Sequence, residues 1–291
     1  MKRRSKRGLI ALGVFSAVIG ITAAVGVGRF VARRDHRYIT PAHVLPLAND
    51  PATLARGEHL ARTVAGCAEC HGDDFAGKLM DEDVMLRAVA PNLTLGAGSA
   101  VRGYDAASWS AAIRGGVNRA GHSLIIMPSR DLAGFSDADL GAVASYLRSL
   151  PPVDRMLAPS RVKPLGMVVL GLVGAPIFSA EEAADAPPPP TQQPVPGPTR
   201  AYGEYLMTSC RGCHGADLRG GLVTQPGTPP SADLSPNALK DRPFASFERA
   251  LRQGVAHDGH VLHEAMPWRA FSGLSDDELR AIWIALRQDE S

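Results

Sequence analysis

Two identical cysteine and histidine patterns are the residues of this chain most able to do chemistry. The chain has 291 residues and four cysteines, all of which lie in these patterns. Each pattern is a Cys-x-x-Cys-His motif, formed by Cys67, Cys70 and His71 and by Cys210, Cys213 and His214. Two thiols and an imidazole at such spacing can bind zinc, act as a redox dithiol, or attach a haem covalently.

The spacing favours haem attachment at both motifs. Thiols three residues apart on one helical turn can reach two vinyl groups on adjacent pyrroles, and the imidazole of the next residue then lies under the iron as an axial ligand. A single zinc site would have to join Cys70 to Cys210, which lie far apart in the sequence. A redox dithiol would be expected in a strand-helix context of the thioredoxin kind, whereas here we expect the motif to end a helix.

The two motifs lie within two copies of one longer pattern. Matching blocks follow in the same order and begin at Arg56 and Tyr202, Cys67 and Cys210, Pro91 and Ala232, Trp109 and Phe247, Gly121 and Gly259, Met127 and Met266, and Ser136 and Ser275. Agreement of this length and order indicates an internal repeat. The sequence therefore predicts two tandem domains, over residues 50–151 and 199–291.

Each copy is predicted to be helical, which gives an all-α fold class. The first helix begins near Pro51 or Thr199 and runs into the motif. A second helix is predicted at about 105–114 and 245–252. The last helix of each copy begins with a capping pattern, in which Ser136 precedes Asp139 and Ser275 precedes Glu278 by three residues.

The N-terminal residues 1–37 are predicted to be a membrane anchor. Residues 9–28 carry no charge, and basic residues flank them on both sides. Twenty helical residues can span the hydrocarbon core of a bilayer, roughly 30 Å thick. A cleaved signal peptide is the alternative, with Thr22, Ala23 and Ala24 as a weak cleavage site inside the apolar run. We prefer the uncleaved helix.

A proline-rich linker, residues 152–198, is predicted to separate the two domains as an extended tether. It contains an apolar strip, residues 165–178, which is too short to span a membrane. We expect this strip to pack on a neighbouring domain. A partner-binding or membrane-surface strip is the alternative.

Met127 and Met266 are the predicted second axial ligands of the iron. They correspond in the repeat, and each precedes a proline that restricts the backbone. Three other methionines are expected to fill gaps in the cores: Met80, Met85 and Met207. The rival ligands are His122 and His260, which would give bis-histidine coordination. Four further side chains are candidates to bind the haem propionates: Trp109, Trp268, Arg114 and Arg252.

These motifs resemble those of class I cytochrome c domains, and the whole chain resembles the membrane-bound multihaem cytochrome c subunits that accompany alcohol, aldehyde and gluconate-type dehydrogenases. The resemblance covers about residues 50–151 and 199–289. It implies two covalently bound haem c groups and an N-terminal helix that crosses a C-terminal helix at Gly57 and at Gly203. It also implies a single-pass protein of the bacterial cytoplasmic membrane, with both haem domains on the periplasmic side.

The predicted function is electron transfer without a catalytic residue of its own. The chain would relay single electrons between a periplasmic dehydrogenase or quinol-oxidising complex and an oxidase or soluble cytochrome. With 31 basic and 29 acidic side chains, it carries no charge excess suited to nucleic acid. The alternative is a haem enzyme, either a dihaem peroxidase or a thiosulfate-oxidising cytochrome. Such enzymes need an iron with a removable ligand, or a further cysteine.

If both motifs attach haem, the paired change Cys67→Ala with Cys70→Ala leaves one covalent haem. Cys210→Ala with Cys213→Ala should do the same, because each pair serves one porphyrin. Haem staining of the denatured chain on a gel measures this, and each double variant should show half the stain of the unchanged protein. Full staining after either double change would contradict attachment at that motif.

Overall fold

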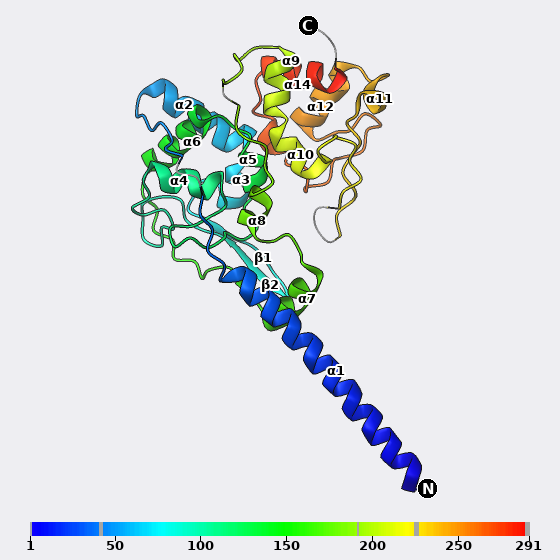
Figure 1. Ribbon diagram of the computed structural model, residues 1–291. Coiled ribbons are helices and arrows are strands. Elements are labelled where there is room, and N and C mark those ends of the chain that lie inside the picture. Colours follow the sequence, from blue (N-terminus) through cyan, green and yellow to red (C-terminus); the bar gives the residue numbers. More distant parts are fainter. Residues whose placement is uncertain (1, 41–42, 191, 224–226, 289–291) are drawn as a thin grey trace.

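A long N-terminal helix projects from a globular body in the computed structural model (Figure 1). The structure describes residues 2–40, 43–190, 192–223 and 227–288. Residues 1, 191 and 289–291, which the predicted anchor, linker and second domain include, lie outside this description. The projecting helix is α1, Lys2–Arg34. Its segment Ile10–Arg34 is the one helix among the described residues that is long and apolar enough to cross a membrane.

The first helical unit follows α1 and contains the first motif. Its elements are α2 (Pro51–His59), the π-helical turn η1 (Leu60–Val64), α3 (Cys67–His71), α4 (Ala106–Ile113), α5 (Ser129–Leu132) and α6 (Asp137–Ser149). Helix α2 begins where the Asp50 carboxylate accepts a hydrogen bond from the Thr53 N–H at 3.0 Å. The predicted cap of α6 is confirmed, because the Ser136 hydroxyl accepts from the Asp139 N–H at 3.1 Å.

The second helical unit repeats this order of elements. It contains α9 (Arg200–Leu206), α10 (Thr208–His214), α11 (Pro236–Leu239), α12 (Phe244–Gln253), α13 (Trp268–Phe271) and α14 (Asp276–Arg287). The predicted cap of α14 is also confirmed: Ser275 and Glu278 form a complete capping box. One continuous hydrophobic core includes buried residues of both units.

Glycines let the first and last helices of each unit cross in close contact. A Cβ atom added to Gly57 of α2 would collide with the carbonyl oxygen of Ala142 in α6. A Cβ atom added to Gly203 of α9 would collide with the carbonyl oxygen of Ala281 in α14. The crossing at these two glycines is the one that the resemblance implied.

The structure is mostly helical, as predicted, but it also contains a small antiparallel sheet that the all-α prediction did not include. Strands β1 (Lys78–Glu82), β2 (Leu86–Ala90) and β3 (Arg161–Val162) pair in that order. They lie in the first unit beside the upper end of α1 (Figure 1). The chain between the first motif and α4 is too long for one turn, and pairing its backbone groups satisfies their hydrogen bonds.

The segment after the first unit is also more ordered than the extended tether we predicted. Besides β3, it forms α7 (Pro164–Val173) and α8 (Ser179–Ala183). Phe178, between them, is buried against Phe30 of α1 with ring centroids 5.4 Å apart. The apolar strip 165–178 therefore folds onto α1 and the first unit, because it can bury apolar surface there.

We expect Gly203→Ala to lower the free energy of unfolding by about 1–3 kcal/mol, because the added methyl group must push two packed helices apart. Gly28→Ala is the matched control, since a Cβ atom at that helical glycine meets no atom within 4 Å. Denaturant unfolding of the detergent-solubilised protein, followed by circular dichroism, measures the difference. Equal stability of both variants would show that the crossing tolerates a larger separation.

Candidate functional site

The first motif forms its own short helix, α3, which a left-handed glycine separates from the preceding turn. Gly66 has φ 60°, so the chain breaks here and does not run into the motif as one continuous helix. The buried His71 ring donates from Nδ1 to the carbonyl oxygen of Pro91 at 2.9 Å. This bond fixes the tautomer and leaves the Nε2 lone pair free to bind a metal.

The second motif lies on α10 and repeats the histidine contact, but here only Met207, in a right-handed helical conformation, separates the helix of the motif from α9. The buried His214 ring donates from Nδ1 to the carbonyl oxygen of Ala232 at 2.8 Å. Ala232 is the counterpart of Pro91 in the sequence repeat, so the two imidazoles are held by equivalent backbone groups. Both rings thus have one nitrogen fixed by the protein and one available as a ligand.

The thiols lack the properties of a redox dithiol. All four cysteines are free in the structure. Burial raises the pKa of Cys67 and of Cys210 to about 12, whereas catalytic dithiols depend on a lowered thiol pKa. Burial also lowers the pKa of both motif histidines, which keeps them neutral, as metal ligands must be. No group of three or more His, Cys, Asp or Glu side chains suited to a metal ion occurs among the described residues.

The predicted methionine ligands lie in equivalent places, half-buried against the common core. Met127 and Met266 each precede a proline and a one-turn helix, α5 or α13.

Sequence reasoning missed the unusual backbone conformation of the residue before Met127. Ile126 has φ 66°, a left-handed conformation that costs a β-branched residue roughly 1–3 kcal/mol. A hydrogen bond of 3.0 Å from its N–H to the Ile177 carbonyl holds it there.

Of the two rival histidine ligands, His260 of the second unit is less well placed to bind an iron than His122 of the first unit. His260 is exposed, and its Nδ1 lies 2.6 Å from the Asp258 carboxylate. His122 is half-buried and forms a backbone bridge with Arg37. Of the methionines predicted to fill core gaps, Met207 is buried, but Met80 is 42% exposed on β1, because that strand has no second layer over it.

The propionate candidates divide into two groups. Trp109 is buried, and its indole N–H has no hydrogen-bond partner among the described residues, so it fits a cofactor that brings a hydrogen-bond acceptor. The two arginines do not fit such a cofactor, because acceptors of the protein already bind them. Arg114 binds the Ala133 carbonyl and the Asp137 carboxylate, at 2.7 and 2.6 Å. Arg252 binds Asp276 at 2.7 Å in the equivalent way. Both arginines therefore brace the start of the last helix.

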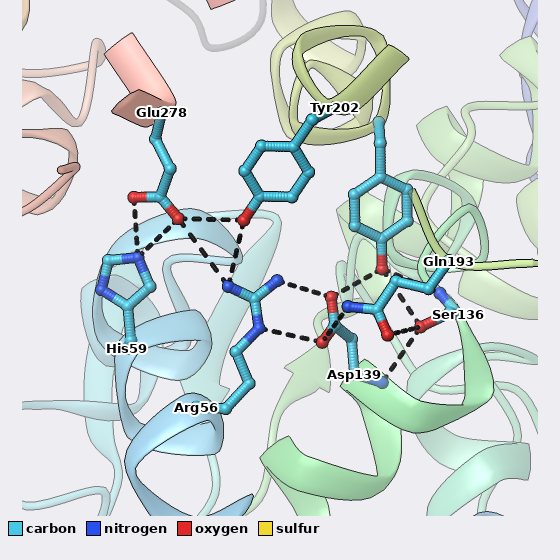
Figure 2. Close-up of polar contacts among 8 residues, drawn as sticks. Arg56, His59, Ser136, Asp139, Gln193, Tyr202 and Glu278 are labelled. Atoms are coloured by element: carbon cyan, nitrogen blue, oxygen red, sulfur yellow. Dashed lines mark hydrogen bonds and ion pairs between the residues drawn. The ribbon is translucent and has the colours of Figure 1, made fainter. Parts of the chain in front are cut away.

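A buried polar network joins the two units (Figure 2). The Arg56 guanidinium donates two hydrogen bonds to Asp139, at 2.9 and 2.8 Å, and lies 3.7 Å from Glu278. Both oxygens of Glu278 lie 2.9 Å from Nε2 of His59. The Tyr205 hydroxyl donates to Asp139 at 2.7 Å. Each helix-capping acid is thus bound by a side chain of the other unit.

The network is pseudo-symmetric, because the contacting residues correspond in the repeat. His59 of α2 reaches the acid of α14, and Tyr205 of α9 reaches the acid of α6. A second pair of contacts repeats the symmetry: a Cβ at Gly134 would lie 2.7 Å from Thr208, and one at Gly273 would lie 2.7 Å from Thr63. Equivalent surfaces of the two units therefore face one another.

This packing brings each methionine segment near the motif of the other unit. Asp131 of α5, which follows Met127, contacts Gly212 inside the second motif. Burial raises the pKa of Asp131 to about 6. On the other side, Gly273, just after α13, meets Thr63 of η1, the turn before the first motif. The interface between the units therefore includes part of the second motif and the turn that precedes the first motif.

Comparison with known proteins identifies the first unit. A family model described as cytochrome c matches residues 54–151. The gluconate 2-dehydrogenase cytochrome c subunit of Pantoea cypripedii is 34% identical over 92 residues, which are 28% of this chain and 21% of that protein. The cytochrome c subunit of the quinone-dependent alcohol dehydrogenase of Gluconobacter oxydans is 35% identical over 92 residues, 28% of this chain and 19% of that protein.

The fructose dehydrogenase cytochrome subunit of Gluconobacter japonicus is 29% identical over 109 residues, 33% of this chain and 22% of that protein. The chain spans about a fifth of the length of these relatives. Residues 54–151 match the cytochrome c family, and the predicted resemblance to cytochrome c subunits of dehydrogenases is confirmed.

The inter-unit network predicts that Glu278→Gln lowers the free energy of unfolding by about 2 kcal/mol, because a buried charged hydrogen-bond acceptor is lost. Burial alone would raise the pKa of Glu278, but His59, the Ser275 N–H and Arg56 together lower it below the ordinary 4.5. Its contribution is therefore complete above pH 4.5 and is lost as pH falls through the lower folded-state value.

Chemical denaturation between pH 3 and pH 7 checks both parts of this prediction. The variant and the unchanged protein should differ at pH 7 and converge at the acid end. Asp277→Asn, on the same turn but exposed, serves as the control and should change stability little. An unchanged free energy in Glu278→Gln at pH 7 would mean that the network adds nothing to the union of the two units.

Proposed function

We propose that the chain is a dihaem electron-transfer protein, in which the second unit is another cytochrome c domain. The observation that carries this proposal is the paired geometry of the two motifs. In each, two free thiols precede a buried, neutral imidazole whose Nδ1 is bonded to an equivalent backbone carbonyl. The first motif lies in a recognised cytochrome c domain, and the second reproduces its contacts.

The residues that would hold the two haem groups follow from this pairing. Cys67 and Cys70 would attach the first porphyrin, with His71 and Met127 as axial ligands. The second would be held by Cys210, Cys213, His214 and Met266. Bound haem supplies a one-electron couple between ferric and ferrous iron. The buried imidazoles, already oriented before binding, need little rearrangement when the iron changes oxidation state.

Electron transfer is favoured over catalysis by the complete ligand set. A histidine and a methionine on each iron would leave no position open to peroxide or another substrate. All four cysteines are accounted for by the two motifs, so none is left as the additional ligand of a thiosulfate-oxidising site. The relatives matched here are themselves cytochrome subunits of dehydrogenases.

We further propose that α1 anchors the protein in the cytoplasmic membrane with both haem domains on the periplasmic side. Support comes from its exposed apolar surface, which includes Ile10, Phe15 and Ile21 at 66%, 63% and 64% exposure. The relatives' names point to a dehydrogenase as electron donor. Anchoring would raise the local concentration of the protein beside such a membrane partner.

Reductive titration with optical detection tests the proposal. The purified chain should take up two electrons, be low-spin in both oxidation states, and show the far-red charge-transfer absorption of methionine-ligated ferric haem. Met127→Ala and Met266→Ala should each remove about half of this band and retain the covalent haem. Met156→Ala, at an exposed position outside both units, should leave the band unchanged.

Three results would overturn parts of the proposal. Uptake of one electron would exclude the second haem. A band that survives one of the methionine changes would exclude that residue as ligand. Saturable peroxide or thiosulfate turnover with a high-spin haem population would favour the enzyme alternative.

A further inference from the structure

Helix α7 is the part of the structure that electron transfer leaves unexplained. Its ten residues, Pro164–Val173, are all apolar or glycine. A helix without a polar face is normally buried in protein or in lipid. Yet Leu165 and Val173 are 52% and 70% exposed, and five of the other side chains are only half-buried. The body of the protein thus covers part of this helix and leaves the rest uncovered.

The position of α7 along α1 indicates what covers the exposed part of α7. A Cβ atom at Gly26 would lie 2.5 Å from the Val168 carbonyl and 3.0 Å from the Leu172 side chain, and one at Gly171 would lie 3.1 Å from Phe30. Further along, Arg33 donates to the Ala175 carbonyl at 2.9 Å. Numbers on both helices increase together, so α7 runs roughly parallel to α1.

The contact with α1 begins inside its uncharged run. Ala23, Gly26, Val27 and Phe30 form the buried or half-buried stripe of α1 that faces α7. Because Val168 lies at the level of Gly26, the start of α7 lies about one turn closer to the middle of the span, near residue 22. If residues 9–28 occupy the hydrocarbon core, then the first half of α7 lies within its outer edge.

We propose that α7 inserts beside α1 into the periplasmic leaflet of the lipid bilayer, so that the protein has a second membrane contact. This inference rests on the proposed anchoring through α1. Leu165 would lie in the hydrocarbon and Val173 at the headgroups. Helix α7 is too short to span the membrane itself. At its deep end, Glu82 is paired with Lys163 at 3.1 Å and with Arg87 at 3.2 Å, which lowers the cost of bringing these three charges close to lipid.

The inserted helix would hold the first haem domain at a fixed height. A small hydrophobic cluster of Phe30, Val162 and Phe178 fastens the α7 segment to α1 and to the sheet. Beyond α7, Phe178 forms a backbone bridge with Ile125. The N–H of Ile126, the residue before Met127, donates to the carbonyl of Ile177. Glu181 adds an ion pair to Arg33. A short, ordered stretch of the chain therefore connects the proposed membrane contact to the segment that carries Met127, the predicted ligand.

Site-directed spin labelling of the full holoprotein in phosphatidylethanolamine and phosphatidylglycerol vesicles tests the inference. Thioether bonds occupy the native cysteines, so Leu165→Cys, Val173→Cys, Val14→Cys and Val261→Cys each introduce one reactive thiol. All four positions are exposed in the protein. Val14 lies within the uncharged run of α1, and Val261 lies in the second unit.

The measured quantity is the ratio of collision rates with oxygen, which concentrates in lipid, and with a water-soluble nickel chelate. We expect the ratio to be several-fold above that of Val261 at both Val14 and Leu165, and intermediate at Val173. A Leu165 ratio equal to that of Val261, with Val14 still in lipid, would overturn the inference and leave the anchor intact.

The other outcomes are also decisive. A water-like ratio at Val14 would remove the anchor on which the inference rests. Exclusion of both reagents from Leu165 would show that a protein surface, such as a second copy of this chain or a partner subunit, covers α7 in place of lipid.

Discussion

The arrangement of the whole body depends on two buried carboxylates, Asp139 and Glu278, that each start a C-terminal helix and bind the opposite unit. A carboxylate taken out of water must be compensated by charge and hydrogen bonds. Asp139 is bound by the Arg56 guanidinium and accepts a hydrogen bond from Tyr205 of the second unit. Glu278 is hydrogen-bonded to His59 of the first unit and lies 3.7 Å from the Arg56 guanidinium. His59 and Tyr205 belong to α2 and α9, and each of these helices crosses the C-terminal helix of its own unit, so capping, crossing and inter-unit contact depend on the same few helices.

This constraint has a consequence for the predicted redox sites. The units face each other through equivalent surfaces, and those surfaces include the methionine segments and the turns next to the motifs. A tether that allowed free motion would leave the separation of the two sites variable. The buried network holds it constant, which suits transfer of electrons between two fixed centres. The same packing places Asp131 of the first unit against the second motif.

The segment between the units, residues 152–198, has a structural role that its proline-rich composition did not indicate. It contributes an edge strand, an apolar helix against α1, and the backbone partners of Ile125 and Ile126. The left-handed conformation of Ile126 can persist because these backbone partners hold it in place. The first unit, α1 and this segment are therefore one connected structure, while the proline-rich stretch from Pro187 onward leads to the second unit.

The two motifs, the haem chemistry that we propose for them and the helical repeat could be predicted from the sequence alone. Covalent haem attachment needs cysteines and a histidine at one spacing, and capping patterns such as Ser275 with Glu278 act within a single turn, so both are local. Only the tertiary structure decided the rest. That His59 meets Glu278, that Arg114 braces a helix, and that α7 lies along α1 depend on residues far apart in the chain. Local periodicity carries no information about such pairings, because an apolar strip or a charged side chain has many possible partners until the fold selects one.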